Sequence, residues 1–325
     1  MVKVRRVRKG DLARVREVIE SGFADYFERQ LGSRPRQVFG GAQYVHHRWL
    51  MEPWGCFVAE ENDTKIVGAS IAIAWGKVGI FGPVAVLTPY QNQKIAQGLL
   101  KASQGFFDEN KVTLQGVATF YGSPKHLLLY QKFGFKPKGL LAVTTRSLER
   151  REPTPPARPS RSAPEIRRLS SLKEAQKKAM LGRLRRITNR IYPGLDLSKE
   201  VEIVDSLALG DVLLLERERQ VLGFAICHTP GASEAPHGAL YVKVLAMDPT
   251  RRRPEYFAQL LGAAEEMAVG AGLQRIIAPV YTRYWRAYQA LLTAGYQIDM
   301  LLVRMKRGKK EDYEREDDFV LDDWR

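Results

Sequence analysis

The sequence repeats itself at a constant offset of 161 residues, and this repeat limits the possible folds more than any other feature. The aligned residues are Gln91 with Arg252, Leu99-Leu100 with Leu260-Leu261, Tyr130 with Leu291, and Gly134-Phe135 with Gly295-Tyr296. Distant positions that keep one offset indicate a duplicated unit rather than chance helical similarity. We therefore expect two tandem lobes of similar fold.

A break in composition separates the two copies. Residues 151–163 hold four prolines and no large apolar side chain, a composition typical of an extended linker. On this basis residues 1–150 form the first lobe, residues 164–308 the second lobe, and residues 309–325 an acidic tail. A chain of 325 residues agrees with the length expected for two domains.

The acidic tail is expected to be a solvated extension or a strap across the basic body of the protein. It carries eight Asp and Glu residues, and clusters of like charge are usually solvated. Its end also carries four large apolar residues, Phe319, Val320, Leu321 and Trp324. These residues indicate that the end of the tail docks on the lobes.

Hydrophobic patterning in the first lobe predicts a central mixed sheet flanked by helices. Apolar residues at helical spacing follow Gly10-Asp11 and recur around residues 44–50 and 93–110. Apolar runs bounded by turn residues predict strands at residues 56–60, 66–75, 79–86 and 112–120. The fold class expected for each lobe is therefore α/β, in the form of an α+β mixed sheet.

Residues 84–100 predict a buried strand that breaks at Pro89 and leads into a helix. The first turn of a helix carries unpaired backbone N–H groups and the positive end of the helix dipole. This junction is therefore suited to bind an anion such as a pyrophosphate.

The same junction resembles motif A of the GNAT superfamily of N-acetyltransferases, Gln or Arg-x-x-Gly-x-Gly or Ala. Gln91, Lys94 and Ala96 occupy the defined places of that motif without a gap. Lys94 stands where the family prefers glycine. Its side chain would either crowd the approach of a phosphate to the backbone or add a cation that contacts the phosphate.

A second segment, residues 123–135, resembles motif B of the same family, Asn-x-x-Ala-x-x-Leu-Tyr-Glu-Lys-x-Gly-Phe. Tyr130 and the Gly134-Phe135 pair match the motif, whereas Ser123 and His126 depart from it. Motif B follows motif A with one predicted strand between them, which is the order of the family. The glycine suits the end of a helix, where a left-handed residue is favoured.

The resemblance implies that acetyl-CoA is the co-substrate, bound by the first lobe. The residues expected to bind it are Val86, Leu87, Gln91, Asn92, Gln93, Lys94, Ile95 and Ala96. Backbone N–H groups near Val86 and Leu87 would polarise the thioester carbonyl. A neutral amine would attack the thioester directly, and Tyr130 would protonate the departing thiolate as the general acid.

The sequence does not identify the general base of this reaction. The predicted strand at residues 79–86 offers no carboxylate. The side chains left as candidates, acting through water, are Asp25, Glu28, His46 and His47. The amine would otherwise have to arrive already deprotonated.

The second copy keeps the fold pattern of the first but lacks the residues expected to bind the cofactor and to catalyse the reaction. The glycine place of motif A is Glu255 and its small-residue place is Phe257, so a like charge and a bulky ring would oppose a pyrophosphate. Leu291 stands at the place of the tyrosine. We expect this degenerate lobe to be mainly structural, completing the acceptor pocket or the interface between the lobes.

Tandem members of the family, such as certain aminoglycoside acetyltransferases, make a small-molecule amine the expected acceptor. Two other functions stay open. One is a non-catalytic CoA-binding or regulatory module, which Lys94 and Ser123 favour. The other is a nucleic-acid or ribosome-associated protein, which the net charge of +15 favours. Nucleic acid is the less favoured partner because the basic residues are scattered, and a basic lobe also attracts CoA.

The sequence gives little support for a metalloprotein, a membrane protein or a secreted protein. Cys56 and Cys227 lie far apart and have no metal-ligand spacing around them, so we expect no metal site and a reducing compartment. No apolar run reaches membrane-spanning length and no signal peptide is recognisable, so a cytoplasmic protein is expected. The oligomeric state is left undetermined.

Overall fold

The computed structural model describes residues 2–34, 40–41, 43–148, 163–308 and 313–325. Almost the whole predicted linker, residues 151–162, and the start of the acidic tail, residues 309–312, lie outside the described residues.

The two halves of the chain contain the same succession of ten helices and strands, apart from short 3-10 turns. The first half consists of β1 (Val2–Arg6), α1 (Leu12–Leu31), α2 (Tyr44–Met51), β2 (Cys56–Glu61), β3 (Lys65–Trp75), β4 (Val78–Val86), α3 (Ile95–Glu109), β5 (Leu114–Phe120), α4 (Pro124–Lys132) and β6 (Lys136–Ser147). The second half consists of β7 (Glu165–Arg168), α5 (Glu174–Ile191), α6 (Ser198–Ser206), β8 (Gly210–Arg217), β9 (Gln220–His228), β10 (Ala239–Met247), α7 (Pro254–Gly270), β11 (Arg275–Tyr281), α8 (Trp285–Thr293) and β12 (Gln297–Gly308). The predicted fold class, two tandem lobes of mixed α/β structure, is confirmed.

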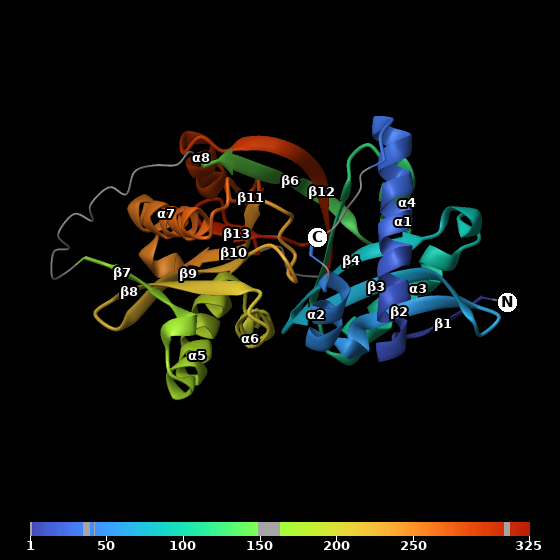
Figure 1. The fold of residues 1–325 in the computed structure, drawn as a ribbon, viewed down its shortest axis with the longest axis horizontal. Coiled ribbons are helices and arrows are strands. Elements are labelled where there is room, and N and C mark those ends of the chain that lie inside the picture. Colours follow the sequence, from blue (N-terminus) through green and yellow to red (C-terminus); the bar gives the residue numbers. More distant parts are fainter. Residues whose placement is uncertain (1, 35–39, 42, 149–162, 309–312) are drawn as a thin grey trace.

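The last strand of each half is exchanged with the other half. Strand β12 pairs with β5 of the first half, and β6 pairs with β11 of the second half. The two exchanged strands also pair with each other along most of their length. As a result one continuous mixed sheet runs through both lobes, in the order β1-β2-β3-β4-β5-β12-β6-β11-β10-β9-β8-β7 (Figure 1). A lobe that contains a strand of its neighbour cannot separate from it without breaking the sheet.

Helices cover the two faces of the sheet in the first lobe. Helix α1 buries Val15 and Val18 against one face of β3 and β4, and α3 buries Leu99 and Phe107 against the other face. Each buried Leu or Phe side chain contributes about 1.5–3 kcal/mol through removal of apolar surface from water. This packing holds α3 firmly on the sheet, so the loop before α3 has a fixed base.

Each lobe has one pair of parallel strands that separate after a short contact. In the first lobe Val78–Ile80 of β4 pair with Leu114–Gly116 of β5. In the second lobe Ala239–Tyr241 of β10 pair with Arg275–Ile277 of β11. The two registers differ by the same 161 residues that relate the two copies in the sequence. Beyond these contacts the two strands of each pair diverge and leave a cleft.

The end of the acidic tail fills the cleft of the second lobe. Strand β13 (Val320–Asp322) pairs with Val244–Ala246 of β10 and also contacts β11. The apolar residues of the tail are buried, and Trp324 is completely inaccessible to solvent. The prediction that the end of the tail docks on the lobes is confirmed, and residues 313–325 are a buried strap rather than a solvated extension.

The acidic groups of this strap are neutralised by basic residues of the body. Arg304 donates two hydrogen bonds of 2.7 Å to the carboxylate of Asp322. The guanidinium of Arg304 also lies 3.3 Å from the centroid of the Trp324 ring. Buried charges need such partners because desolvation would otherwise cost several kcal/mol per ion, of the order of the whole stability of a domain.

Candidate active site

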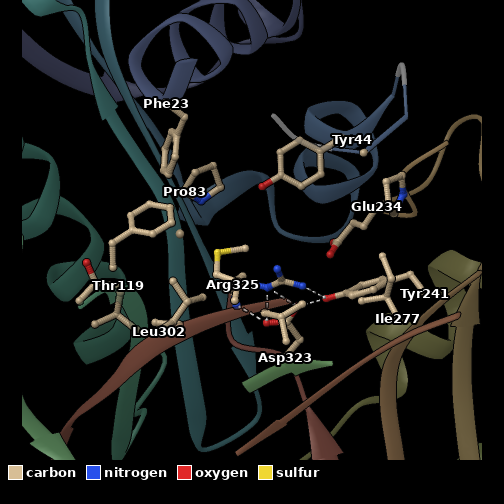
Figure 2. A pocket seen from close by; sticks show the side chains of 18 of the residues that line it. Phe23, Tyr44, Pro83, Thr119, Glu234, Tyr241, Ile277, Leu302, Asp323 and Arg325 are labelled. Atoms are coloured by element: carbon tan, nitrogen blue, oxygen red, sulfur yellow. Dashed lines mark hydrogen bonds and ion pairs between the residues drawn. The ribbon is translucent and has the colours of Figure 1, made fainter. Parts of the chain in front are cut away.

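A cavity of about 540 Å³ lies between the two lobes, at the open end of the first-lobe cleft. Strands β4 and β5 and helices α1, α2 and α4 form one side (Figure 2). Residues from β6, β10, β11 and β12, the segment before β10 and the end of the tail form the other side. The cavity is therefore formed by residues of both lobes.

Strand β4 reaches the cavity at a distortion in its ladder. The register with β3 shifts between Ser70 and Ala72, opposite the segment that contains Gly82 and Pro83. Gly82 has a φ of 153°, which a residue with a side chain rarely adopts. Gly82, Pro83 and Val84 line the cavity. Gly82 and Pro83 were not predicted as site residues, although a Gly-Pro pair inside a strand is a signal of an irregular strand.

Tyr130 lines the same cavity from α4. Its ring lies edge-on to Phe81 and to Phe135, with centroid distances of 5.7 and 6.3 Å. Burial raises the pKa of Tyr130 above its usual range, because the apolar surroundings disfavour the phenolate. The phenol therefore keeps its proton at neutral pH, as a group that donates a proton must.

The predicted anion-binding loop lies at the start of α3. Asn92 and Lys94 have φ angles of 66° and 63°, so two residues of this loop are left-handed. Lys94 is the N-cap of α3, and this conformation explains in physical terms why glycine is preferred there. The first intrahelical bond joins the Gly98 N–H to the Lys94 carbonyl, which leaves earlier N–H groups of the first turn directed outward.

The other predicted cofactor residues lie around this loop, and none of the eight lines the cavity described above. Gln91 donates from Nε2 to the Val86 carbonyl at 3.1 Å and thereby fixes the loop to the end of β4. Asn92, Gln93 and Lys94 are exposed, whereas Ile95 is buried. Ala96 is partly buried, so a ligand approaching the loop would meet its backbone and the Lys94 side chain first.

One part of the sequence prediction is wrong, namely the backbone N–H group of Leu87 as an oxyanion donor. This N–H already donates to the Val67 carbonyl at 2.9 Å. Val86 lies opposite Gly68 in the β3–β4 register. Because successive N–H groups along a strand point to opposite sides, the N–H of Val86 is directed away from β3, and its role as an oxyanion donor stays a prediction. The ladder between β3 and β4 continues one residue past the strand end, and sequence patterning does not locate that last bond.

The four candidate bases are found outside the cavity lining. Asp25 and Glu28 both bind Arg34, and Asp25 also accepts a hydrogen bond from Thr88. His46 stacks on Trp49. His47 is buried with Nε2 3.4 Å from Oε1 of Glu234. His47 thereby contacts a residue that lines the cavity.

A cluster of charged residues at the second-lobe side of the cavity was not predicted. Arg48 donates to Glu234 and to the Gly82 carbonyl, each at 2.8 Å, and Lys243 lies 3.0 Å from Glu234. Burial alone would raise the pKa of Glu234, but the charges of Arg48 and Lys243 outweigh it and hold that pKa well below its usual range. The members come from α2, β10 and the turn before β10, so no local motif reveals the cluster.

The strands and the motif that build this site match a family model. Residues 52–137 match the model described as acetyltransferase (GNAT) domain, a segment that includes both cleft strands and the whole of α4. The first lobe belongs to the GNAT superfamily. No curated protein sequence matched the chain in the corresponding search.

Solved structures extend the GNAT fold to the whole chain. A candidate acetyltransferase from Pyrococcus horikoshii is similar over 99% of this chain and 95% of its own, with a TM-score of 0.67 and 15% identity. A GCN5-related N-acetyltransferase from Sphaerobacter thermophilus covers 96% of this chain and 98% of its own, with a TM-score of 0.58 and 13% identity. A tandem GNAT protein from the clavulanic acid biosynthesis pathway covers 96% and 100%, with a TM-score of 0.57 and 8% identity. These similarities show a tandem GNAT fold.

Two kinds of feature are absent from the residues that the structure describes. Among these residues, no helix has the length and apolar character needed to cross a membrane. No group of three or more His, Cys, Asp or Glu residues with metal-binding geometry occurs among the same residues.

Proposed function

We propose that the protein is an N-acetyltransferase that transfers the acetyl group of acetyl-CoA to the amine of a small molecule. The observation that carries this proposal is the open cleft of the first lobe, which ends at Tyr130 and at the cavity between the lobes. The GNAT family match of residues 52–137 supports the same chemistry. The second lobe, in this proposal, completes the acceptor pocket.

In the first lobe, acetyl-CoA would bind along the open edge of β4 and at the positive N-terminal end of α3. Beyond Ile80, β4 has no further partner on its β5 side among the described strands, so its backbone groups on that side are open to a strand-like ligand. The loop from Gln91 to Ala96 would receive the pyrophosphate at the α3 N-terminus. The exposed Lys94 adds a cation to that loop, and charge-assisted hydrogen bonds to phosphate are about twice as strong as neutral ones.

The reaction proposed is a direct transfer. The nitrogen lone pair of the neutral amine attacks the thioester carbon, a C–N bond forms, and the C–S bond breaks. The thiolate takes the phenolic proton of Tyr130, the amide nitrogen releases its extra proton to water, and the Tyr130 phenolate regains a proton from water. The raised pKa of Tyr130 makes the phenol rather than the phenolate the form present when the thiolate leaves.

One acetyl-CoA per chain is expected. In the second lobe, β13 already occupies the cleft between β10 and β11. Phe257, at the small-residue place of motif A, is buried and packs against Phe319 of the tail. A ligand could enter this cleft only by displacing the strap.

Isothermal titration calorimetry with acetyl-CoA tests the proposal. We expect one site per chain and a loss of at least tenfold in affinity for Lys94→Glu, about 1.4 kcal/mol, because a cation beside phosphate becomes an anion. Lys101→Glu, an exposed lysine on the same helix, is the matched control and should keep the affinity. Absence of binding, or equal effects of the two substitutions, would contradict the proposal.

The alternative of a CoA-binding protein without turnover stays a prediction, favoured by Lys94 and Ser123 at places where the family has other residues. It is distinguished by an amine screen on the same preparation, monitored by release of free thiol. Binding with no thiol release for any amine would select this alternative. RNA or DNA affinity that falls steeply with salt would select the nucleic-acid alternative.

A further inference from the structure

The end of the tail brings two charged residues, Asp323 and Arg325, into the cavity between the lobes (Figure 2). Two contacts anchor this part of the tail. Upstream, Asp318 is buried with Oδ1 2.9 Å from Nε of Arg252. Trp324, which lies between Asp323 and Arg325 in the chain, packs closely on β5. A Cβ atom added at Gly116 would lie 2.1 Å from its ring. The position of Arg325 is therefore fixed by both lobes.

The side chain of Arg325 is hydrogen-bonded mainly along one edge, and its guanidinium also lies 5.7 Å from the centroid of the Tyr241 ring. Its Nε donates to the two oxygens of Asp323 at 3.0 and 2.8 Å. Asp323 is in turn fixed by a hydrogen bond from the Tyr241 hydroxyl. Nη2 of Arg325 has a single weak contact, 3.4 Å from the Tyr241 oxygen, and no bond from Nη1 is recorded within the described chain. The edge formed by Nη1 and Nη2 is thus available to a ligand.

Arg48, the other arginine of the cavity, differs from Arg325 in this respect. All three of its nitrogens are used, by Glu234, by the Gly82 carbonyl and by the Arg325 carbonyl, each at 2.8 Å. Its side chain is 2% exposed, against 28% for Arg325. Arg48 is a structural part of the wall, whereas Arg325 faces the space that an acceptor would fill.

Charged groups of both signs surround the cavity. Three cations, Arg48, Lys243 and Arg325, pair with the carboxylates of Glu234 and Asp323. A third carboxylate, Asp299, lines the cavity and accepts a hydrogen bond from Thr145. The open edge of Arg325, rather than a surplus of positive charge, therefore favours a ligand anion.

We propose that Arg325 binds a carboxylate of the acceptor, so that the acceptor is an amine that also carries a carboxylate. This inference rests on the proposed function and adds the substrate class to it. The planar fork of an arginine binds both oxygens of a carboxylate, which fixes the orientation of the acceptor as well as its affinity. The amine is then directed toward Tyr130 across the cavity.

Much of the remaining wall of the cavity is apolar and selects the body of the acceptor, although Asp299, His126 and His237 also line it. Its apolar residues include Phe23, Phe27, Pro83, Phe120 and Leu302. Apolar pockets with a few fixed polar groups bind ligands whose body is buried and whose polar ends are oriented. An α-amino acid with an apolar or aromatic side chain fits this arrangement.

A matched pair of acceptors tests the proposal. L-phenylalanine and phenethylamine share the amine and the ring, but only phenylalanine has the carboxylate. We expect kcat/KM to be higher for phenylalanine, and Arg325→Ala to lower it about 10- to 100-fold for this acceptor alone, as for the loss of a hydrogen bond to a charged group. Arg325→Lys should restore part of it, since lysine keeps the charge without the fork. Arg14→Ala, an exposed arginine of α1, is the control.

A binding measurement decides the proposal even if the protein has no turnover. N-acetyl-L-phenylalanine and N-acetyl-L-phenylalanine amide differ only in the charge of the carboxyl end. Calorimetry should show tighter binding of the acid, and Arg325→Ala should remove that preference. Equal binding of the two compounds, binding of neither, or a preference that survives Arg325→Ala overturns the proposal. A preference for the acid without acetyl transfer would instead contradict the proposed function and keep the carboxylate site.

Discussion

In the first lobe β4 and β5 separate around an open cleft, whereas in the second lobe β10 and β11 separate around a strand of the same chain. The registers of the two strand pairs are equivalent, so the difference does not come from the sheets themselves. It comes from the tail, which supplies β13 to one cleft only. The comparison shows that a cleft built for an extended ligand is also suited to an extended piece of polypeptide.

The helix that begins beside each cleft shows the same contrast. In the first lobe the N-cap residue Lys94 is left-handed and exposed, and it makes no side-chain bond to the helix. In the second lobe the N-cap residue Arg253 is extended and is followed by Pro254. Arg252, which aligns with Gln91, pairs with Asp318 of the tail. A carboxylate of the chain thus lies where the first lobe offers its anion-binding loop.

The exchange of β6 and β12 makes the two lobes depend on each other. A loss of stability in one lobe is therefore transmitted to the sheet of the other. The tail adds a second connection, since Trp324 packs on β5 while β13 pairs with β10. The tail segment that fills the cleft of the second lobe therefore also stabilises the strands around the open cleft of the first.

The largest expected effect comes from removing the Trp324 side chain. Trp324→Ala leaves a large cavity and uncovers Arg304, so we expect the free energy of unfolding to fall by about 3–5 kcal/mol. Urea unfolding monitored by circular dichroism measures it. Trp285→Ala, at a position that is 47% exposed, is the control and should have little effect. Equal stability of the two variants would mean that the tail is not a structural strap.

Tyr130→Phe is expected to affect the first lobe through chemistry alone. The variant keeps the ring contacts with Phe81 and Phe135 but loses the proton donor. Turnover should fall about 100- to 1,000-fold, within the range for general acid catalysis, while the calorimetric affinity for acetyl-CoA stays the same. Because burial raises the pKa of Tyr130, the wild-type rate should not decline up to pH 10 through loss of this proton. Unchanged turnover would remove Tyr130 from the mechanism.

A pair of aligned positions separates the roles of the two clefts. Arg252→Ala leaves the buried carboxylate of Asp318 with one cation fewer, so stability should fall by about 1–3 kcal/mol without loss of acetyl-CoA affinity. Gln91→Ala should weaken the affinity for acetyl-CoA with little loss of stability, because Gln91 holds the open loop to the end of β4. Thermal unfolding and calorimetry on both variants measure the two effects. A weaker affinity for acetyl-CoA in Arg252→Ala would indicate a ligand in the second lobe.

The sequence predicted the parts of the fold that are local or repeated. The offset of 161 residues reappears in the strand registers, and the left-handed residues Asn92 and Lys94 lie where motif A was placed. The strand exchange and the meeting of Arg48 with Glu234 and Arg325 were not predictable in this way. They join residues up to 277 positions apart, and neither periodicity nor composition specifies which distant segments pair.

The smallest effect predicted concerns the backbone of the anion-binding loop. A non-glycine residue in the left-handed region costs about 1–2 kcal/mol of stability. Glycine removes this cost, but its greater freedom in the unfolded chain offsets part of the gain. We therefore expect Lys94→Gly to raise the free energy of unfolding by about 0.5–1 kcal/mol, measured by urea unfolding. Lys101→Gly, inside α3, should lower it by about as much, because glycine is unfavourable within a helix. If Lys94→Gly also weakens acetyl-CoA binding, the lysine acts as a phosphate contact. If it strengthens binding, the lysine side chain obstructs the approach of a phosphate to the backbone of the loop.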